Sequence, residues 1–419
     1  MMGRIILHCD LNNFYASVEC LHHPEWRGRP VAVCGRQEAR HGIVLAKNMQ
    51  AKGCGVKTGE TIWQARQKCP DLLVAAPHPE LYLRYSGLTR AIMNRYSDRV
   101  EPFGIDEAWL DVTRCPLARQ AGGPAVADDL RRRIQEELGL TASVGVADNK
   151  IFAKLASDLR KPDATTVITQ ANYRAQVFPL PVEDLLYVGP ATRRKLNRTG
   201  VYTIGELARC QRGMLRGLLG KWGETLWVFA NGLDREPVAV LGDAATVKSV
   251  GNSITTARDL TCEQDARIIL YALAESVAER LRLGGLEGTV VQLWERDNAL
   301  QSLERQQTLQ RPTAAASDLA AAALELLRAH AGFDPPLRAL GVRACGLIPA
   351  RRDTQLSLLE DRTLPSKQQR LEQTIDDIRR RFGHFALQRG VMLTDPALSS
   401  LNPVEEHVIH PVPYFDVRR

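Results

Sequence analysis

The segment Val100–Val112, VEPFGIDEAWLDV, constrains the fold most, because it places two adjacent carboxylates, Asp106 and Glu107, inside an apolar run. Neighbouring side chains of a strand point to opposite faces, so two carboxylates in mid-strand would diverge. Pro102 and Gly104 interrupt the run, which predicts a hairpin with both carboxylates near its tip. Like charges held so close raise each other's pKa unless a cation neutralises them, and this indicates a divalent metal. The alternative is that Asp106 caps the turn and Glu107 is solvated.

A third carboxylate follows the first strand of the chain. Residues 3–11 are mostly apolar, as in a buried strand, and Asn12 or Asn13 can cap the helix that comes next. Ligands of sheet proteins often bind where a buried strand ends, so Asp10 is a candidate ligand-binding residue. A second helix cap is the other interpretation of Asp10.

The order of elements predicts an α+β fold. At about 100–200 residues per domain, 419 residues suggest roughly two to four domains. Up to residue 168 the patterns predict strand, helix, strands, helix, hairpin, helix and strand, consistent with a ferredoxin-like sheet that carries an insertion. Helices follow, and residues 248–349 alternate strands and helices. Beyond them we expect a charged helix over Lys367–Phe382 and a loosely structured end.

Composition narrows the cellular setting. The net charge of +7 permits nucleic-acid binding without requiring it. The nine cysteines form no CxxC pair, which is typical of free thiols in a reducing cytosol, and we expect a cytoplasmic protein. No apolar run approaches the roughly 18 residues that span a bilayer, and the first residues turn polar too soon for a signal peptide.

Two segments predict phosphate binding. Lys150 begins the helix NKIFAKLASDL, where the helix dipole favours anions; a solvated lysine is the alternative. Residues 181–210 predict two short helices joined by VGPA, a helix-hairpin-helix whose turn amides near Gly189 and Ala191 would grip one DNA phosphate. Residues 170–242 hold ten basic and six acidic side chains, which favours this over a plain helical hairpin.

A short apolar cluster lies in the charged segment that follows residue 350. It predicts a peptide that docks into a pocket of a partner, and the start of a frayed helix is the alternative. Its residues are Gln355, Leu356, Leu358 and Leu359.

Five segments, in this order, resemble the Y family of translesion DNA polymerases, in particular its bacterial members: CDLNNFYASVE, GVKTGETIWQA, GIDEAWLDVT, TASVGVADNKIFAKLASDLRKPD and VGPAT. The resemblance covers about residues 1–350 and implies a right-hand polymerase with a ferredoxin-like palm. The domains it implies are a palm (1–22 and 78–168), fingers (23–77), a helix-hairpin-helix thumb (169–241), an α/β little finger (242–350) and a C-terminal tail (351–419) with a clamp-binding peptide and a helix.

The resemblance implies that Asp10, Asp106 and Glu107 are catalytic and bind two Mg²⁺ ions. Asp10 and Asp106 would bridge both ions, Glu107 would hold the ion at the primer 3′-hydroxyl, and the Leu11 carbonyl would complete the other site. Two metals about 3.5–4 Å apart assist both the attacking and the leaving oxygen of a phosphoryl transfer.

The resemblance also assigns nucleotide contacts. The ring of Tyr15 would exclude a ribose 2′-hydroxyl, and the triphosphate would contact the amides of Asn13 and Phe14 and the ammonium of Lys150. Met49 and Lys52 stand where many relatives have tyrosine and arginine. Because lysine lacks the bidentate fork of arginine, Lys52 is expected to supply charge only.

We therefore expect a template-directed DNA polymerase of lesion bypass, without proofreading, that acts on primer-template DNA and deoxynucleoside triphosphates. It would be a monomer, would bind the sliding clamp through Gln355–Leu359 and would not bind a membrane. One alternative is a nonpolymerising scaffold in the DNA damage response, against which the intact carboxylates speak. The other is a two-metal cyclase, which would not need a phosphate-gripping helical hairpin.

Overall fold

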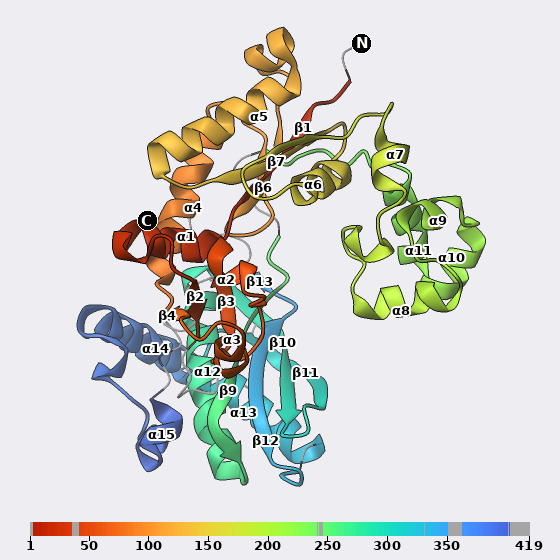
Figure 1. Ribbon diagram of the computed structural model, residues 1–419. Helices are drawn as coiled ribbons and strands as arrows, with labels where there is room; N and C mark the ends of the chain where they lie inside the picture. The colour runs from red at the N-terminus through yellow and green to blue at the C-terminus, as the bar shows by residue number, and fades with distance from the viewer. Residues whose placement is uncertain are drawn as a thin grey trace. The chain divides into compact units, whose positions relative to one another are not determined.

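A computed structural model describes residues 3–35, 42–240, 242, 246–330, 332–350, 363–400 and 402 (Figure 1). The chain divides into two compact units, Met1–Cys34 with Val44–Asp243 and Gly35–Ile43 with Ala244–Arg419. Each unit has its own sheets and apolar core. No helix in these residue ranges is long and apolar enough to cross a membrane.

The central sheet of the first unit has the strand order β5-β6-β1-β7-β8. Strand β1 pairs antiparallel with β6 and β7, and β8 runs parallel to β7. In β1 only Asp10 is even partly exposed, which is why its sequence is almost continuously apolar. The strands are β1 (Ile6–Leu11), β5 (Val100–Pro102), β6 (Glu107–Asp111), β7 (Ala142–Ala147) and β8 (Thr165–Val167).

Helices cover both faces of this sheet (Figure 1). A Cβ added at Gly145 of β7 would collide with the backbone of α6 (Lys150–Leu159), so α6 packs directly on that face. The side chain of the next residue, Val146, points to the other face, where a Cβ added at Gly123 of α5 (Pro116–Leu138) would lie 2.7 Å from it. Helices α1 (Phe14–His22) and α4 (Pro79–Met93) pack against each other in the same unit.

The segment between α1 and α4 forms a small sheet of its own, in the order β3-β2-β4. Strands β2 and β3 pair antiparallel, and β4 is parallel to β2. Thr61 and Gln64 form a capping box at the start of α3. The elements are the 3-10 turn η1 (Pro24–Trp26), β2 (Val31–Cys34), β3 (Val44–Lys47), α2 (Met49–Gly53), α3 (Ile62–Lys68) and β4 (Leu73–Ala75).

The first unit ends in short helices whose apolar residues continue the core beneath α6. The segment before VGPA is a single 3-10 turn, η2 (Val182–Asp184), where the sequence predicted a short helix. The turn ends after Asp184 because Leu185 has extended backbone angles (φ −70°, ψ 131°). The helices are α7 (Tyr173–Val177), α8 (Pro190–Arg198), α9 (Ile204–Arg209), α10 (Arg212–Leu219) and α11 (Lys221–Ala230).

The second unit is an antiparallel sheet, order β11-β10-β12-β9, with two helices that pack together on it and bury their apolar faces. The short strand β13 pairs with the start of β10. The elements are β9 (Ser249–Leu260), α12 (Glu263–Leu283), β10 (Leu286–Asp297), β11 (Ser302–Thr313), α13 (Ala316–His330), β12 (Leu337–Cys345) and β13 (Ile348–Pro349).

The C-terminal helix is part of the second unit, held to α12 by ion pairs. Arg282 of α12 lies 2.9 Å from Glu372 and 2.7 Å from Asp376, and all three side chains are nearly buried. The residues beyond it include Met392 and Leu398, which are buried in the core of the unit, so the expectation that the last thirty residues are loosely structured is wrong for residues 390–400. The elements are α14 (Thr363–Phe382), η3 (His384–Ala386), η4 (Gly390–Thr394) and α15 (Pro396–Ser399).

Candidate active site

The strand register brings Asp10 and Glu107 together. They lie directly opposite each other in the antiparallel pair of β1 and β6. Opposed residues project to the same face, with their Cβ atoms about 4.5–5.5 Å apart. The next pair on this face is His8 and Trp109, and Nδ1 of His8 lies 2.9 Å from the hydroxyl of Ser157 in α6. Both carboxylates therefore lie on the face that α6 covers.

Asp106 lies in the turn just before β6, where its carbonyl accepts a hydrogen bond from the amide of Leu11 at 3.0 Å. Burial and the charge of Asp10 raise the pKa of the Asp106 carboxyl. Burial also raises the pKa of Glu107, and the charges of Asp10 and Asp106 add to the effect. A Cβ at Gly104 would lie 3.3 Å from Cγ of Glu107, so glycine leaves room for the carboxylates at the hairpin tip.

Two lysines balance this negative charge. The Nζ atom of Lys154, on α6, lies 2.6 Å from Oε2 of Glu107 and 3.3 Å from Oδ2 of Asp10. Nζ of Lys161 lies 2.9 Å from the same oxygen of Asp10. Burial lowers the pKa of Lys154, but the charges of Glu107 and Asp10 outweigh it and raise the pKa overall. Both lysines are therefore ammonium ions.

The carboxylates fit a divalent metal by their chemistry. As the side chains stand, the described residues contain no group of three or more His, Cys, Asp or Glu arranged to hold a metal ion. Asp10 and Glu107 nevertheless converge on one cation, the Lys154 ammonium, and Asp106 adds charge beside them. Carboxylate oxygens are the ligands that Mg²⁺ prefers in proteins. A metal would compete with Lys154 for these oxygens.

The start of α1 adds positive potential next to Asp10. Asn13 has left-handed backbone angles (φ 50°, ψ 37°), and its side chain does not cap the helix. The first N–H groups of a helix have no acceptor within the helix, so the amides of Asn13 and Phe14 are suited to an anion. Tyr15 follows, with its ring stacked on that of Tyr82 at 4.1 Å and 9°. Burial, and then the charge of Asp106, raise the pKa of Tyr15, so this hydroxyl lies within electrostatic reach of the carboxylates.

The structure does not bring Lys150 to the carboxylates. Its ammonium is buried, lies 2.7 Å from Glu101 and lies 4.8 Å from the centroid of the Trp109 ring. Glu101 of β5 pairs with Trp109 of β6, and Trp109 lies two residues after Glu107 along β6. The prediction that Lys150 contacts the triphosphate therefore lacks support from its position. Lys52 is exposed on α2.

Lys154 and Lys161, the lysines that do reach Asp10, are not among the site residues predicted from the sequence. Lys154 follows Lys150 by about one helical turn, so the two share a face of α6. The helical spacing of the two lysines can be recognised in the sequence. The register of β1, β5 and β6 decides which lysine lies near Asp10 and Glu107 and which lies near Glu101 and Trp109.

The predicted DNA-phosphate residues lie at the start of α8. Gly189 is its N-cap, Pro190 is its first residue, and a Cβ at Gly189 would meet open space. Arg194, Lys195 and Arg198 are exposed further along this helix. The predicted clamp-binding residues, Gln355, Leu356, Leu358 and Leu359, lie outside the described residues.

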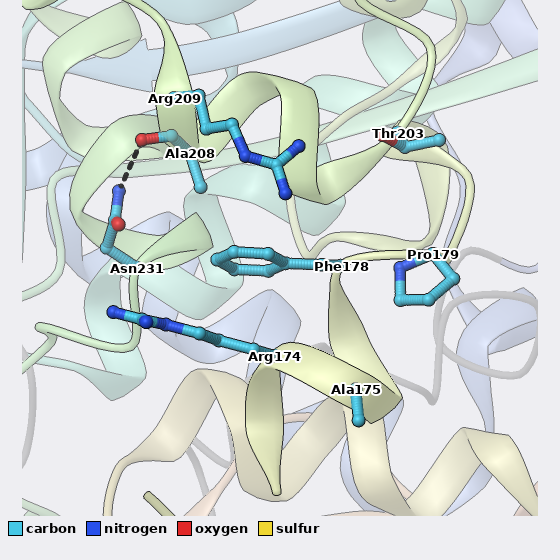
Figure 2. Close-up of a pocket in the computed structure, with 8 residues that line it drawn as sticks. All are labelled: Arg174, Ala175, Phe178, Pro179, Thr203, Ala208, Arg209 and Asn231. Carbon is cyan, nitrogen blue, oxygen red and sulfur yellow. Dashed lines mark hydrogen bonds between the residues drawn. The ribbon is translucent and has the colours of Figure 1, made fainter.

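A pocket of about 750 Å³ among α7, α9 and α11 contains none of the predicted site residues. Figure 2 shows the ring of Phe178 between the guanidinium groups of Arg174 and Arg209, and the guanidinium carbon of Arg209 lies 5.4 Å from the ring centroid. The amide of Asn231 donates to the Ala208 carbonyl at its edge. The carboxylates therefore do not belong to this pocket.

Known proteins of one kind match nearly the whole chain. The profile of the impB/mucB/samB family matches residues 9–158, and that of the family's C-terminal domain matches residues 247–358. DNA polymerase IV of Acetivibrio thermocellus is 50% identical over 96% of this chain and 100% of its own length. DNA polymerase IV of Moorella thermoacetica is 40% identical, covering 93% and 96%. DNA polymerase IV 1 of Bacillus subtilis is 34% identical, covering 93% and 94%.

A solved structure has the same fold. A Y-family DNA polymerase chimera aligns with a TM-score of 0.73 over 82% of this chain and 99% of its own, at 24% sequence identity. The predicted α+β fold of a right-hand polymerase is thereby confirmed. The resemblance inferred from the five sequence segments is confirmed as well, and the chain belongs to the impB/mucB/samB family, the Y family of DNA polymerases.

Proposed function

We propose that this chain extends a primer 3′ end on a DNA template by two-metal nucleotidyl transfer, without proofreading. Membership of the Y family makes it a DNA-directed DNA polymerase of translesion synthesis, with primer-template DNA and deoxynucleoside triphosphates as substrates. The observation that supports the mechanism most is that β1 and the hairpin bring Asp10, Asp106 and Glu107 to one place.

The metal site of the proposal consists of Asp10, Asp106, Glu107 and the Leu11 carbonyl. Two Mg²⁺ ions held there would lower the pKa of the primer hydroxyl and offset the charge that develops on pyrophosphate. Asp10 and Glu107 already share one cation, which supports their role. Burial, and to a smaller extent repulsion from neighbouring carboxylates, raise the pKa of Asp106 and Glu107, and bound cations would favour the ionised form of both.

The triphosphate would lie at the start of α1, against the amides of Asn13 and Phe14. Lys161 is 2.9 Å from Asp10 and would supply charge there, as would Lys154 once it releases the carboxylates. Lys52 stays a prediction for the same role. In this position the sugar would face Tyr15, whose ring would exclude a 2′-hydroxyl and so select deoxynucleotides.

The remaining parts of the proposal concern DNA and partners. Residues 1–22 and 78–168 act as palm, 23–77 as fingers, 169–241 as thumb and 242–350 as little finger. The amides near Gly189 and Ala191 grip a DNA phosphate, and the open, basic surface of α8 supports this. The protein acts as a monomer in the cytoplasm, and Gln355–Leu359, in the tail of residues 351–419, binds the sliding clamp.

Primer extension by the Asp106→Asn variant tests the proposal. Asparagine keeps the shape but removes the charge that a bridging ligand needs, so extension should fall by at least about a thousandfold. The matched control is Asp98→Asn, an exposed aspartate just before β5, which should extend primers at the wild-type rate. Extension by Asp106→Asn near the wild-type rate would exclude the metal assignment.

A further inference from the structure

A fully buried carboxylate, Glu19 of α1, belongs to none of the groups described above. One of its oxygens accepts a hydrogen bond from the Tyr82 hydroxyl at 2.5 Å. The two oxygens lie 2.9 Å and 3.1 Å from Nδ1 of His78. Because a buried carboxylate is costly unless it is paired, these partners fix its position. His78 is the N-cap of α4 and Tyr82 lies in its first turn, so Glu19 ties the start of α4 to α1.

Tyr82 connects Glu19 to Tyr15. Its ring is fully buried and stacks on the Tyr15 ring, nearly parallel, at 4.1 Å. Phe14 lies on a second side, with ring centroids 6.2 Å apart. Burial and the hydrogen bond to Glu19 raise the pKa of Tyr82, so its hydroxyl stays protonated and keeps donating. Tyr15 and Glu19 are one turn apart on α1, so the anchor and the ring that it supports face the same helix, α4.

We propose that Glu19 is a positioning residue for sugar selection: it fixes the Tyr82 hydroxyl, and the Tyr82 ring then holds Tyr15 against the sugar. The inference rests on the proposed function, in which Tyr15 excludes ribonucleotides. The Tyr15 ring excludes a ribose 2′-hydroxyl by steric clash only if the ring cannot move away. The selectivity therefore depends on how rigidly the neighbouring residues hold the ring. An anchor that serves stability alone would leave selectivity unchanged.

The Tyr82→Phe variant tests the inference, because it removes the hydroxyl and keeps the ring. The quantity measured is the ratio of kcat/KM for a deoxynucleotide to that for the matching ribonucleotide in single-nucleotide insertion. We expect this ratio to fall about tenfold, through faster ribonucleotide insertion, with deoxynucleotide insertion within about twofold of wild type. Glu19→Gln, which keeps an acceptor but loses the charge, should shift the ratio less and in the same direction.

Tyr85→Phe is the matched control. It makes the same change on the same helix, but the Tyr85 hydroxyl lies 3.5 Å from Nε2 of His22 and touches neither Glu19 nor Tyr15. Its ratio should equal that of wild type. Thermal unfolding of each variant, measured alongside, separates lost stability from lost selectivity, and Tyr82→Phe decides the question if Glu19→Gln does not fold.

Tyr15→Ala separates this inference from the proposed function. If Tyr15→Ala keeps the wild-type ratio, Tyr15 does not select the sugar and the inference falls with that assignment. If Tyr15→Ala abolishes the preference while Tyr82→Phe and Glu19→Gln keep it, the role of Tyr15 stands. In that case Glu19 is a structural anchor only, and the inference is overturned.

Discussion

Three lysines near one sheet face have different surroundings, and their contacts predict different roles. Lys150 is buried against Glu101 and the Trp109 ring, whereas Lys161 is partly exposed and pairs with Asp10. Lys154 lies between Asp10 and Glu107. We therefore expect Lys154 and Lys161, which contact the carboxylates, to meet an incoming triphosphate before Lys150 at the start of α6 does.

Lys161→Met and Lys150→Met should therefore differ in what they change. Lys161→Met should raise KM for deoxynucleoside triphosphate about tenfold, because an ammonium near the phosphates is lost, with little change in the unfolding temperature. Lys150→Met leaves Glu101 without its buried partner and should cost about 3 kcal/mol of stability. Steady-state insertion kinetics and urea unfolding measure the two effects. A large rise in KM for Lys150→Met alone would restore Lys150 as the triphosphate lysine.

At the scale of the element, the sequence predicted most strands and helices, but not which side chains face inward. Over residues 80–98, apolar side chains recur every three to four residues, which predicts that a helix packs on the core through Leu81, Tyr85, Leu88, Ile92 and Tyr96. The buried residues are Tyr82, Ser86, Thr89, Ile92 and Met93, and Leu88 is exposed. Ser86 and Thr89 are buried because their hydroxyls donate to the carbonyls of Ile105 and Tyr85. A hydrophobic pattern cannot detect a polar residue that is buried through a hydrogen bond.

Helix α5 is interrupted where the sequence AGGPA predicts a linker. Gly122 in this segment has non-helical backbone angles (φ 83°, ψ 171°), so two helical segments meet there within Pro116–Leu138. Gly123 is packed so closely under Ile5 and Val146 that a Cβ would lie 2.7 Å from each. The glycines serve the approach of a helix to the sheet, which only the tertiary structure reveals.

The start of α12 provides a pH-dependent prediction. Asp265 accepts two hydrogen bonds from Arg258 of β9, which lower its pKa to about 2. Because the pKa is below the unfolded value of about 3.9, the stabilisation is present above about pH 4 and is lost as the pH falls toward 2. Asp265→Asn should cost about 1–2 kcal/mol at neutral pH and progressively less below pH 4.

Urea unfolding over this pH range measures the effect. Asp377→Asn is the control, because it breaks an exposed pair with Arg380 and should change stability by less than about 0.5 kcal/mol at any pH. A cost for Asp265→Asn that stays constant down to pH 2 would show that the amide differs from the carboxylate in packing, not in charge.

At the scale of the whole molecule, the proposed clamp peptide lies between two elements of the second unit. Strand β13 ends at Pro349 and α14 begins at Thr363. Deletion of Gln355–Leu359 should abolish clamp-stimulated synthesis and spare basal extension, because tethering raises the local concentration of the polymerase at the primer. Primer extension with and without the clamp measures both. Equal stimulation of the deleted protein would exclude the peptide as the clamp-binding segment.

The sequence predicts a charged helix over Lys367–Phe382 but does not show which of its charges have partners. Glu275 of α12 is buried and lies 2.9 Å from Arg379 and 2.7 Å from Arg389, and Arg282 is paired in the same way with Glu372 and Asp376. These pairs join parts of the chain about 100 residues apart, so no local pattern contains them. They make α14 part of the folded unit.

A chain that ends at residue 350 should therefore unfold in two separated steps. The second unit loses its ion pairs to α14 and the buried side chains of Met392 and Leu398, at a cost of about 3–6 kcal/mol, while the first unit keeps its core. Calorimetry should show one transition moved to lower temperature and one unchanged. A chain that ends at residue 402 keeps all these contacts and should melt as the full chain does. Equal shifts of both transitions would mean that the two units unfold as one.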